Sequence, residues 1–201
     1  MPPTPISMTE DRFLSGFTWP DFVAHMRVNQ KRVSQLFDEI ILTQDDRQGF
    51  AEAITGHDGQ VHIVALVEDW CGDVAVILPL VARLATEVAG ISLRLFVRSD
   101  NPDLARAYAE VGITSIPVLS FFNSDWHEVG RWVERSAAAH RQVADWNAAH
   151  PQIETLRRSD QPQDRSAYRA LMKERLIEMM GWYRDGLWQA TLAELKSELS
   201  G

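Results

Sequence analysis

The pattern of apolar and polar positions predicts alternating strands and helices through the middle of the chain. Residues 61–67 form an almost unbroken apolar run with β-branched members, which is typical of a strand buried on both faces. Later segments predict strands over 91–97, 118–122 and 128–133 and helices over 74–89, 102–110 and 137–148. This order is typical of an α/β fold with an inner parallel pair of strands and antiparallel strands added later.

The segments on either side of this alternating core predict helices alone. Near-helical apolar spacing over 20–41 predicts one long helix. Residues 168–199 contain two amphipathic stripes, and Gly181 and Gly186 mark the expected joint between them. Residues 1–19, with three prolines in the first five positions, predict a tail that either stays mobile or packs late, without a role in the fold.

These patterns divide the chain into four segments. They are a tail over 1–19, an N-terminal helical extension over 20–56, an α/β domain over 57–150, and a C-terminal helical extension over 151–201. We expect the last segment to pack on the same domain.

Composition narrows the range of partners. The 20 Lys and Arg residues against 28 Asp and Glu residues give a net charge of −8, which removes the electrostatic attraction that non-specific nucleic-acid binding needs. No segment approaches the roughly 18 apolar residues of a membrane span, and the first residues lack a signal-peptide pattern. We therefore expect a cytoplasmic protein with neither nucleic acid nor membrane as a partner. The sequence does not determine its oligomeric state.

The chain has a single cysteine, Cys71, which follows the buried strand and opens the next helix. The N–H groups and dipole at a helix start stabilise a thiolate, and can lower a cysteine pKa from about 8.5 to roughly 3.5–7.5. Trp70 offers a flat apolar wall and Gly72 allows close approach by another chain, whereas the Asp73 carboxylate opposes thiolate formation unless it serves mainly the helix start. Any redox reaction must take its second sulfur from another molecule.

The residues around Cys71 resemble the active site of the thioredoxin family. Trp70-Cys71-Gly72-Asp73-Val74 is similar to Trp-Cys-Gly-x-Cys, and a proline follows in the next helix at position 79 as in that family. Residues 112–118 are similar to the family segment Gly-Ile-x-x-Ile-Pro-Thr, and Asn-Pro at 101–102 lies between the two motifs. The resemblance covers about residues 60–148. It implies a thioredoxin fold, a central mixed β-sheet flanked by helices, here with helical extensions at both ends.

The resemblance also assigns a role to Ile116 and Pro117. The corresponding proline of the family is cis and faces the cysteine, and the backbone of the residue before it pairs with an extended substrate strand. We expect Ile116 to do the same, with the alternative that Pro117 only begins a strand.

Three residues depart from the family pattern. Val74 stands at the position of the resolving cysteine, so a mixed disulfide on Cys71 has no internal thiol to release it. Ala65 replaces a buried acidic residue, and Leu95 replaces its lysine neighbour. The two replacements predict an apolar interior beneath the motif, without an uncompensated buried charge.

Two functions of different classes fit these residues. In the first, Cys71 carries out monothiol thiol–disulfide exchange: it attacks a disulfide or accepts glutathione as a co-substrate, and an external thiol resolves the adduct. The partners are then proteins or low-molecular-weight thiols and disulfides. In the second, the chain is a non-catalytic binding module that uses the groove near Trp70 and Pro117. The expected groove residues are Trp70, Gly72, Asp73, Ile116 and Pro117. A third, an iron–sulfur cluster bridged by Cys71 and glutathione, would need the motif of monothiol glutaredoxins, which this sequence lacks.

The remaining candidates favour structural roles. Glu68 and Asp69 precede the motif, but we expect them to be solvated at an exposed strand end rather than to act as a base for Cys71. The six histidines show no metal-ligand spacing, so we expect neither a metal nor a resident cofactor. Trp126, Trp132 and Trp146 are expected to pack against the added helices.

Overall fold

The computed structural model describes residues 6–200, which divide into two compact units. The first unit consists of two chain segments, the residues up to Glu134 and those from Leu192 onward. The second unit is Arg135–Thr191. The three prolines at the start of the predicted tail lie outside the described residues.

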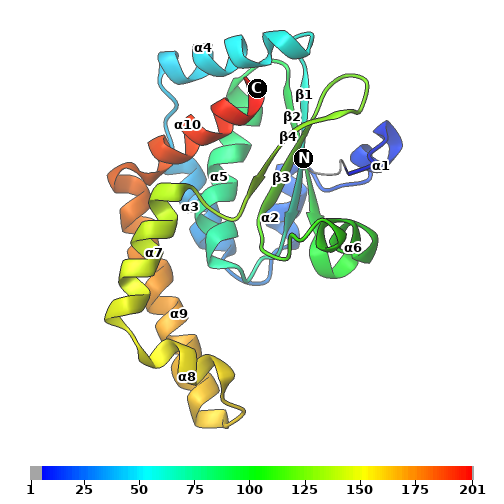
Figure 1. Cartoon of the computed structure of the whole chain (residues 1–201). Coiled ribbons are helices and arrows are strands. Elements are labelled where there is room, and N and C mark those ends of the chain that lie inside the picture. Colours follow the sequence, from blue (N-terminus) through cyan, green and yellow to red (C-terminus); the bar gives the residue numbers. More distant parts are fainter. Residues whose placement is uncertain (1–5, 201) are drawn as a thin grey trace. The chain divides into compact units, whose positions relative to one another are not determined.

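A mixed sheet of four strands forms the centre of the first unit (Figure 1). The strand order is β2-β1-β3-β4, and the strands are β1 (Val61–Val67), β2 (Ile91–Val97), β3 (Val118–Phe122) and β4 (Glu128–Val133). β1 pairs in parallel with β2 and antiparallel with β3, which pairs antiparallel with β4. All four strands lie where the sequence predicts them. Of the parallel pair only β1 is internal, because β2 occupies an edge.

Helices cover both faces of this sheet (Figure 1). α5 (Gly72–Glu87) connects β1 to β2 and is buried along most of its length, including the predicted proline at position 79. α6 (Pro102–Glu110) lies on the opposite face and buries Leu104 and Tyr108. The predicted thioredoxin-like architecture is confirmed in the sheet and in these two helices.

Residues 6–19 belong to the core, so the prediction of a tail without a role in the fold is wrong for this segment. Ile6, Met8 and Phe13, the last of them in α1 (Glu10–Leu14), are buried in the same apolar cluster as residues of β1 and β3. The backbone N–H and C=O of Phe17 both bond to Leu95 of β2, each at 2.9 Å. Apolar residues at such irregular spacing have no periodicity from which packing could be predicted.

The single helix predicted over 20–41 is in fact two helices, α2 (Trp19–His25) and α3 (Gln30–Glu39). The chain turns between them at Asn29, whose φ of 61° lies in the left-handed region that asparagine tolerates. Two further elements, α4 (Gln44–Ala53) and η1 (Ile54–His57), lead into β1. α4 has no counterpart among the predicted elements, although Thr43 and Asp46 form a capping box at its start.

The second unit is helical. It contains α7 (Ala137–Ala149), α8 (Gln152–Arg158), α9 (Pro162–Trp182), η3 (Tyr183–Leu187) and the first turn of α10 (Trp188–Leu199). Ser136 caps α7 as predicted, with its Oγ accepting from Ala139 N. Gly186, at a φ of 132°, makes the joint between α9 and α10, whereas Gly181 lies within α9, contrary to the prediction. α8 has no predicted counterpart.

The end of α10 belongs to the first unit, where it packs against β4. Trp132 Nε1 donates a hydrogen bond to Glu194 Oε2 at 3.0 Å, which confirms that this tryptophan packs against an added helix. A Cβ at Gly130 would lie 2.6 Å from the backbone oxygen of Glu198, so only glycine permits this approach. Within residues 6–200, no helix is both long enough and apolar enough to cross a membrane.

The packing of residues 6–19 is testable by truncating Phe13. We expect Phe13→Ala to lower the free energy of unfolding by about 3 kcal/mol, because it leaves a cavity in the core. The neighbouring Leu14 is 55% exposed, so Leu14→Ala should cost less than about 0.5 kcal/mol. Urea denaturation of both variants measures the difference, and equal losses would contradict the packing of this segment.

Candidate functional site

Cys71 lies in the turn between β1 and α5. Its backbone N–H donates to the carbonyl oxygen of Glu68 at 3.2 Å, and its own carbonyl accepts from Ala75 N at 3.1 Å. The second bond is the first of the α5 ladder and makes Cys71 the N-cap residue of that helix. The partly exposed thiol therefore lies at the positive end of the helix dipole, as the sequence predicts.

The loop before β3 brings Ile116 and Pro117 to this thiol. Cys71 Sγ donates to the carbonyl oxygen of Ile116 at 3.5 Å, although the two residues are 45 positions apart. The Ile116–Pro117 peptide bond is cis, the geometry that the resemblance implies. Both residues are buried, so it is the backbone at Ile116 that faces the sulfur.

Trp70 and Arg98 form the rim beside Cys71. Trp70 is 57% exposed, and the Arg98 guanidinium carbon lies 5.9 Å from the centre of its ring. Arg98 Nη1 also donates to the carbonyl of Thr114 at 3.2 Å, two residues before Ile116. An open cavity of about 730 Å³ adjoins this rim and is lined by Glu68, Trp70, Arg98, Ser99, Pro102 and Ala105. Sequence reasoning missed Arg98, although it follows β2 directly and parallel strands end at a common edge.

The floor beneath Cys71 is apolar. Ala65 and Leu95 are direct partners in the register of β1 and β2, and both are fully buried. Val74 is fully buried one turn into α5. The apolar interior that these residues predict is confirmed. Asp73 is buried in the first turn of α5, where the helix dipole stabilises a carboxylate.

Glu68 and Asp69 both accept hydrogen bonds from loop amides. The prediction that they are solvated is wrong for Glu68, which is buried, whereas Asp69 is partly exposed. Glu68 is 7% exposed, and its Oε1 accepts from Ser99 N at 2.7 Å. Asp69 Oδ2 accepts from the backbone N–H groups of Arg27 and Val28 at 2.7 and 3.1 Å. Their partners lie 31 to 42 positions away, so no local pattern could reveal them.

A family model described as thioredoxin matches residues 16–147 of this chain. The chain belongs to the thioredoxin family. The match includes Cys71, the Ile116–Pro117 bond and all four strands. The motif at residues 70–74 has one cysteine where Trp-Cys-Gly-x-Cys has two, because Val74 occupies the position of the second.

Two solved structures share the fold over nearly the whole chain. A Pseudomonas aeruginosa protein described as of unknown function is 18% identical, with a TM-score of 0.62, and the match covers 96% of this chain and 98% of that one. A structure described as an HIV epitope-scaffold is 16% identical, with a TM-score of 0.59 and coverage of 94% and 95%. At these identities the likeness shows the fold alone.

A smaller cavity of about 180 Å³ lies behind Ile116, between α6 and β3 of this thioredoxin fold. Tyr108 forms part of its wall and shares a 2.8 Å hydrogen bond with Ser120 Oγ. Burial raises the pKa of Tyr108 to about 12, against the opposing effect of the Ser120 hydrogen bond. The phenol therefore remains neutral at physiological pH and carries no charge to the site.

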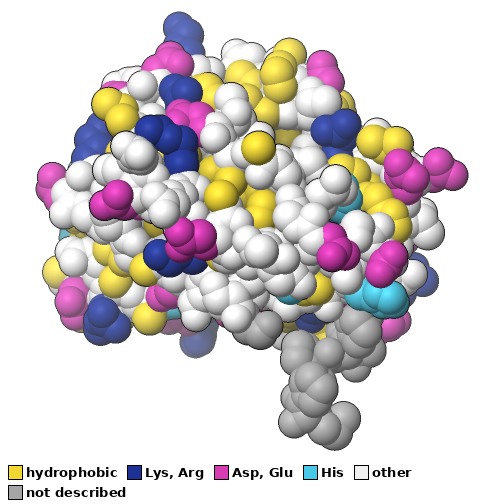
Figure 2. Space-filling view, turned by 90° about the horizontal axis from the view of Figure 1, so that it is seen from above, with side chains coloured by type: hydrophobic (Ala, Val, Ile, Leu, Met, Phe, Trp, Pro, Cys, Tyr) yellow, Lys and Arg dark blue, Asp and Glu magenta, His cyan; other side chains and the backbone are white. Residues whose placement is uncertain are grey.

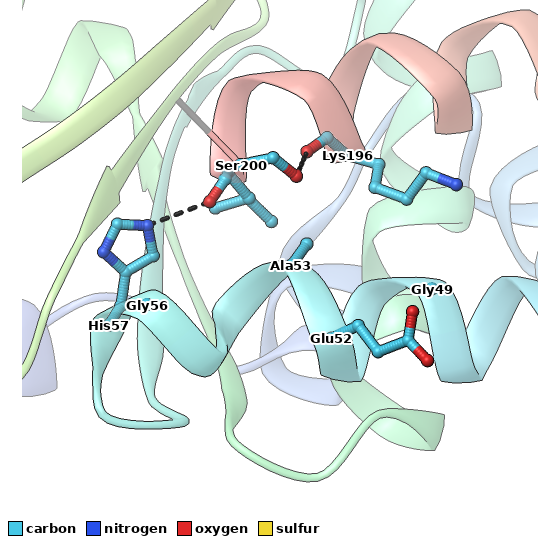
Figure 3. Close-up of a pocket in the computed structure, with 8 residues that line it drawn as sticks. Gly49, Glu52, Ala53, Gly56, His57, Lys196 and Ser200 are labelled. Atoms are coloured by element: carbon cyan, nitrogen blue, oxygen red, sulfur yellow. Dashed lines mark hydrogen bonds between the residues drawn. The ribbon is translucent and has the colours of Figure 1, made fainter.

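A third cavity, of about 490 Å³, lies at the other end of the sheet, between α4, η1 and the end of α10 (Figure 3). Glu52, His57 and Lys196 line it, and His57 Nε2 lies 2.9 Å from the carbonyl oxygen of Leu199. None of the predicted site residues lines this cavity.

On the face of the molecule seen in Figure 2, acidic, basic and hydrophobic side chains are interspersed.

The other predicted candidates occupy packed positions. His62 stacks on Trp126 with ring centres 4.5 Å apart, and its Nδ1 lies 2.7 Å from Ser92 Oγ. Burial lowers the pKa of His62, while the charge of Glu10 acts in the opposite direction. In the second unit Trp146 stacks on a histidine at position 150. In the described part of the chain, no group of three or more His, Cys, Asp or Glu residues could hold a metal ion.

The burial of Glu68 gives a test of this rim. We expect Glu68→Ala to lower the free energy of unfolding by about 1–3 kcal/mol, because Ser99 N loses its acceptor. Glu68→Gln keeps an acceptor oxygen and should cost markedly less. Urea denaturation at neutral pH compares the two variants, and a neutral Glu68→Ala would mean that the carboxylate is solvated after all.

Proposed function

We propose that this chain carries out monothiol thiol–disulfide exchange with Cys71 as the nucleophile. One observation carries the proposal: Cys71 is a partly exposed residue at the N-cap of α5, and its Sγ lies 3.5 Å from the carbonyl oxygen of Ile116. The helix start favours the thiolate, which is the attacking form in disulfide exchange.

The reaction has two displacement steps. The Cys71 thiolate attacks one sulfur of a substrate disulfide, a bond to Cys71 forms as the substrate S–S bond breaks, and the other sulfur leaves as a thiolate that takes up a proton. Val74 has no thiol, so an external thiol must attack the substrate sulfur of the mixed disulfide. A disulfide forms between that thiol and the substrate as the bond to Cys71 breaks, and Cys71 leaves as a thiolate. Glutathione or a protein thiol can serve as this reductant, which suits a reducing compartment such as the cytoplasm.

The rim residues supply the binding surface for the substrate. Trp70 presents an exposed indole beside the thiol, and Gly72 leaves room for an approaching backbone. An extended segment of a protein substrate would lie along the backbone at Ile116, with its sulfur in front of Cys71. Asp73 is 6% exposed and lies in the first turn of α5.

A second candidate function is a binding module without redox activity. The exposed Trp70 and the missing resolving thiol favour it, because both remain compatible with a groove that only holds a partner. Under this alternative Cys71 reacts no faster than an ordinary cysteine.

Alkylation of Cys71 separates the two functions. We expect iodoacetamide to alkylate the native protein faster than the urea-unfolded protein at pH 6. The ratio of the native to the unfolded rate constant should fall about tenfold by pH 9, because the unfolded thiol ionises over this range. Cys71→Ser provides the blank. A ratio that does not change between the two pH values would contradict a stabilised thiolate and favour the binding module.

Restoring the second cysteine tests whether the groove is competent for a full dithiol cycle. Val74 lies three positions after Cys71 on α5, so Val74→Cys places two thiols on neighbouring positions of one helix face. We expect this variant to accelerate insulin reduction by dithiothreitol roughly tenfold over the wild type.

The matched control is Val76→Cys, which adds a buried cysteine farther along the same helix. Five positions from Cys71, its sulfur lies too far along the axis for a disulfide, so it should leave insulin reduction unchanged. Equal activity of the two variants would contradict the proposed site geometry.

A further inference from the structure

The loop between α2 and α3 is bound to the turn that carries Cys71. Asp69 Oδ2 accepts the backbone N–H groups of Arg27 and Val28, at 2.7 and 3.1 Å. The side-chain amide of Asn29 donates back to the carbonyl oxygen of Asp69 at 3.0 Å. Three hydrogen bonds thus join the N-terminal extension to a residue that is two positions from the thiol.

The geometry of the loop matches this attachment. Asn29 has the left-handed φ of 61° at the N-cap of α3, and its side-chain amide is the group that reaches the Asp69 carbonyl. Arg32 Nη1 donates to Asn29 Oδ1 at 3.3 Å and orients the amide that reaches Asp69. The loop is therefore held to Asp69 through the backbone N–H groups of Arg27 and Val28.

This attachment leaves two large apolar side chains exposed on either side of Asp69. Val28 is 46% exposed and Trp70 is 57% exposed. Val28 N is bound to the Asp69 carboxylate, and Trp70 follows Asp69 in the chain, so both residues adjoin Asp69. Exposed apolar side chains that gather beside a nucleophile are a typical recognition surface.

We propose that Asp69 is a positioning residue that holds Val28 as a second wall of the Cys71 groove, and that Val28 and Trp70 together receive an apolar side chain next to the substrate cysteine. This inference rests on the proposed function and names its substrate class, a protein disulfide with an apolar neighbour. Glutathione has no apolar side chain beside its cysteine. Val28 and Trp70 therefore favour peptide disulfides over glutathione disulfide.

Two short peptides with the same leaving group test the preference. Each carries one cysteine in mixed disulfide with thionitrobenzoate, preceded by leucine in one peptide and by serine in the other. Cys71 attacks the peptide sulfur and expels thionitrobenzoate as a coloured thiolate, so a single turnover gives the rate constant for each peptide.

We expect the wild type to react about tenfold faster with the leucine peptide, the change that one buried apolar contact supplies. Val28→Ser and Asp69→Ala should lower the ratio of the leucine-peptide rate constant to the serine-peptide rate constant from about ten to about one. Asp69→Asn keeps an acceptor oxygen and should retain most of the preference. Ile41→Ser is the matched control, because Ile41 is apolar and 83% exposed but follows the far end of α3.

The other outcomes are distinguishable. If the wild type treats both peptides alike, or if the variants slow both peptides equally, the wall has no role in recognition and the inference is overturned, while the proposed function stands. If Cys71 reacts with neither peptide faster than the urea-unfolded protein does, the proposed function fails as well. Val28 lies on the surface, so Val28→Ser keeps the test valid even if Asp69→Ala fails to fold.

Discussion

Strand β1 is apolar along almost its entire length and is paired along both edges, and this constraint organises the first unit. Only His62 among its seven residues is not fully buried. An internal strand of this kind needs cover on both faces, which α5 and α6 supply together with Ile6, Met8 and Phe13. The N-terminal segment is therefore part of the cover for β1.

The same pairing brings the site together. β3 runs antiparallel to β1, with Leu66 opposite Val118, so the start of β3 must lie beside the end of β1. Cys71 follows the end of β1, and the Ile116–Pro117 bond comes just before β3. The contact between Sγ and the Ile116 carbonyl is thus a consequence of strand register, with no need for a special interaction to create it.

Three carboxylates lie close to the thiol in the chain, and two of them are buried, Glu68 at 7% and Asp73 at 6% exposure. The register partners Ala65 and Leu95 are both apolar and fully buried. Glu68 and Asp69 instead bind the amides of loops that follow β2 and α2. An apolar floor avoids the cost of a buried charge, and the two rim carboxylates each gain backbone donors. The site is therefore positioned by its loops and has no internal proton-handling pair.

The sequence by itself determined the four strands, α5, α6, α7 and the lone cysteine at a helix start, because β-branched apolar runs and helical periodicity are local properties of the chain. It also determined the apolar floor at Ala65, Val74 and Leu95. Only the tertiary structure decided where Asp69 and Glu68 bind, that Arg98 reaches the rim, and that residues 6–19 enter the core. These contacts join backbone and side-chain groups that are far apart in sequence, so they exist only once β1 and its neighbours have assembled.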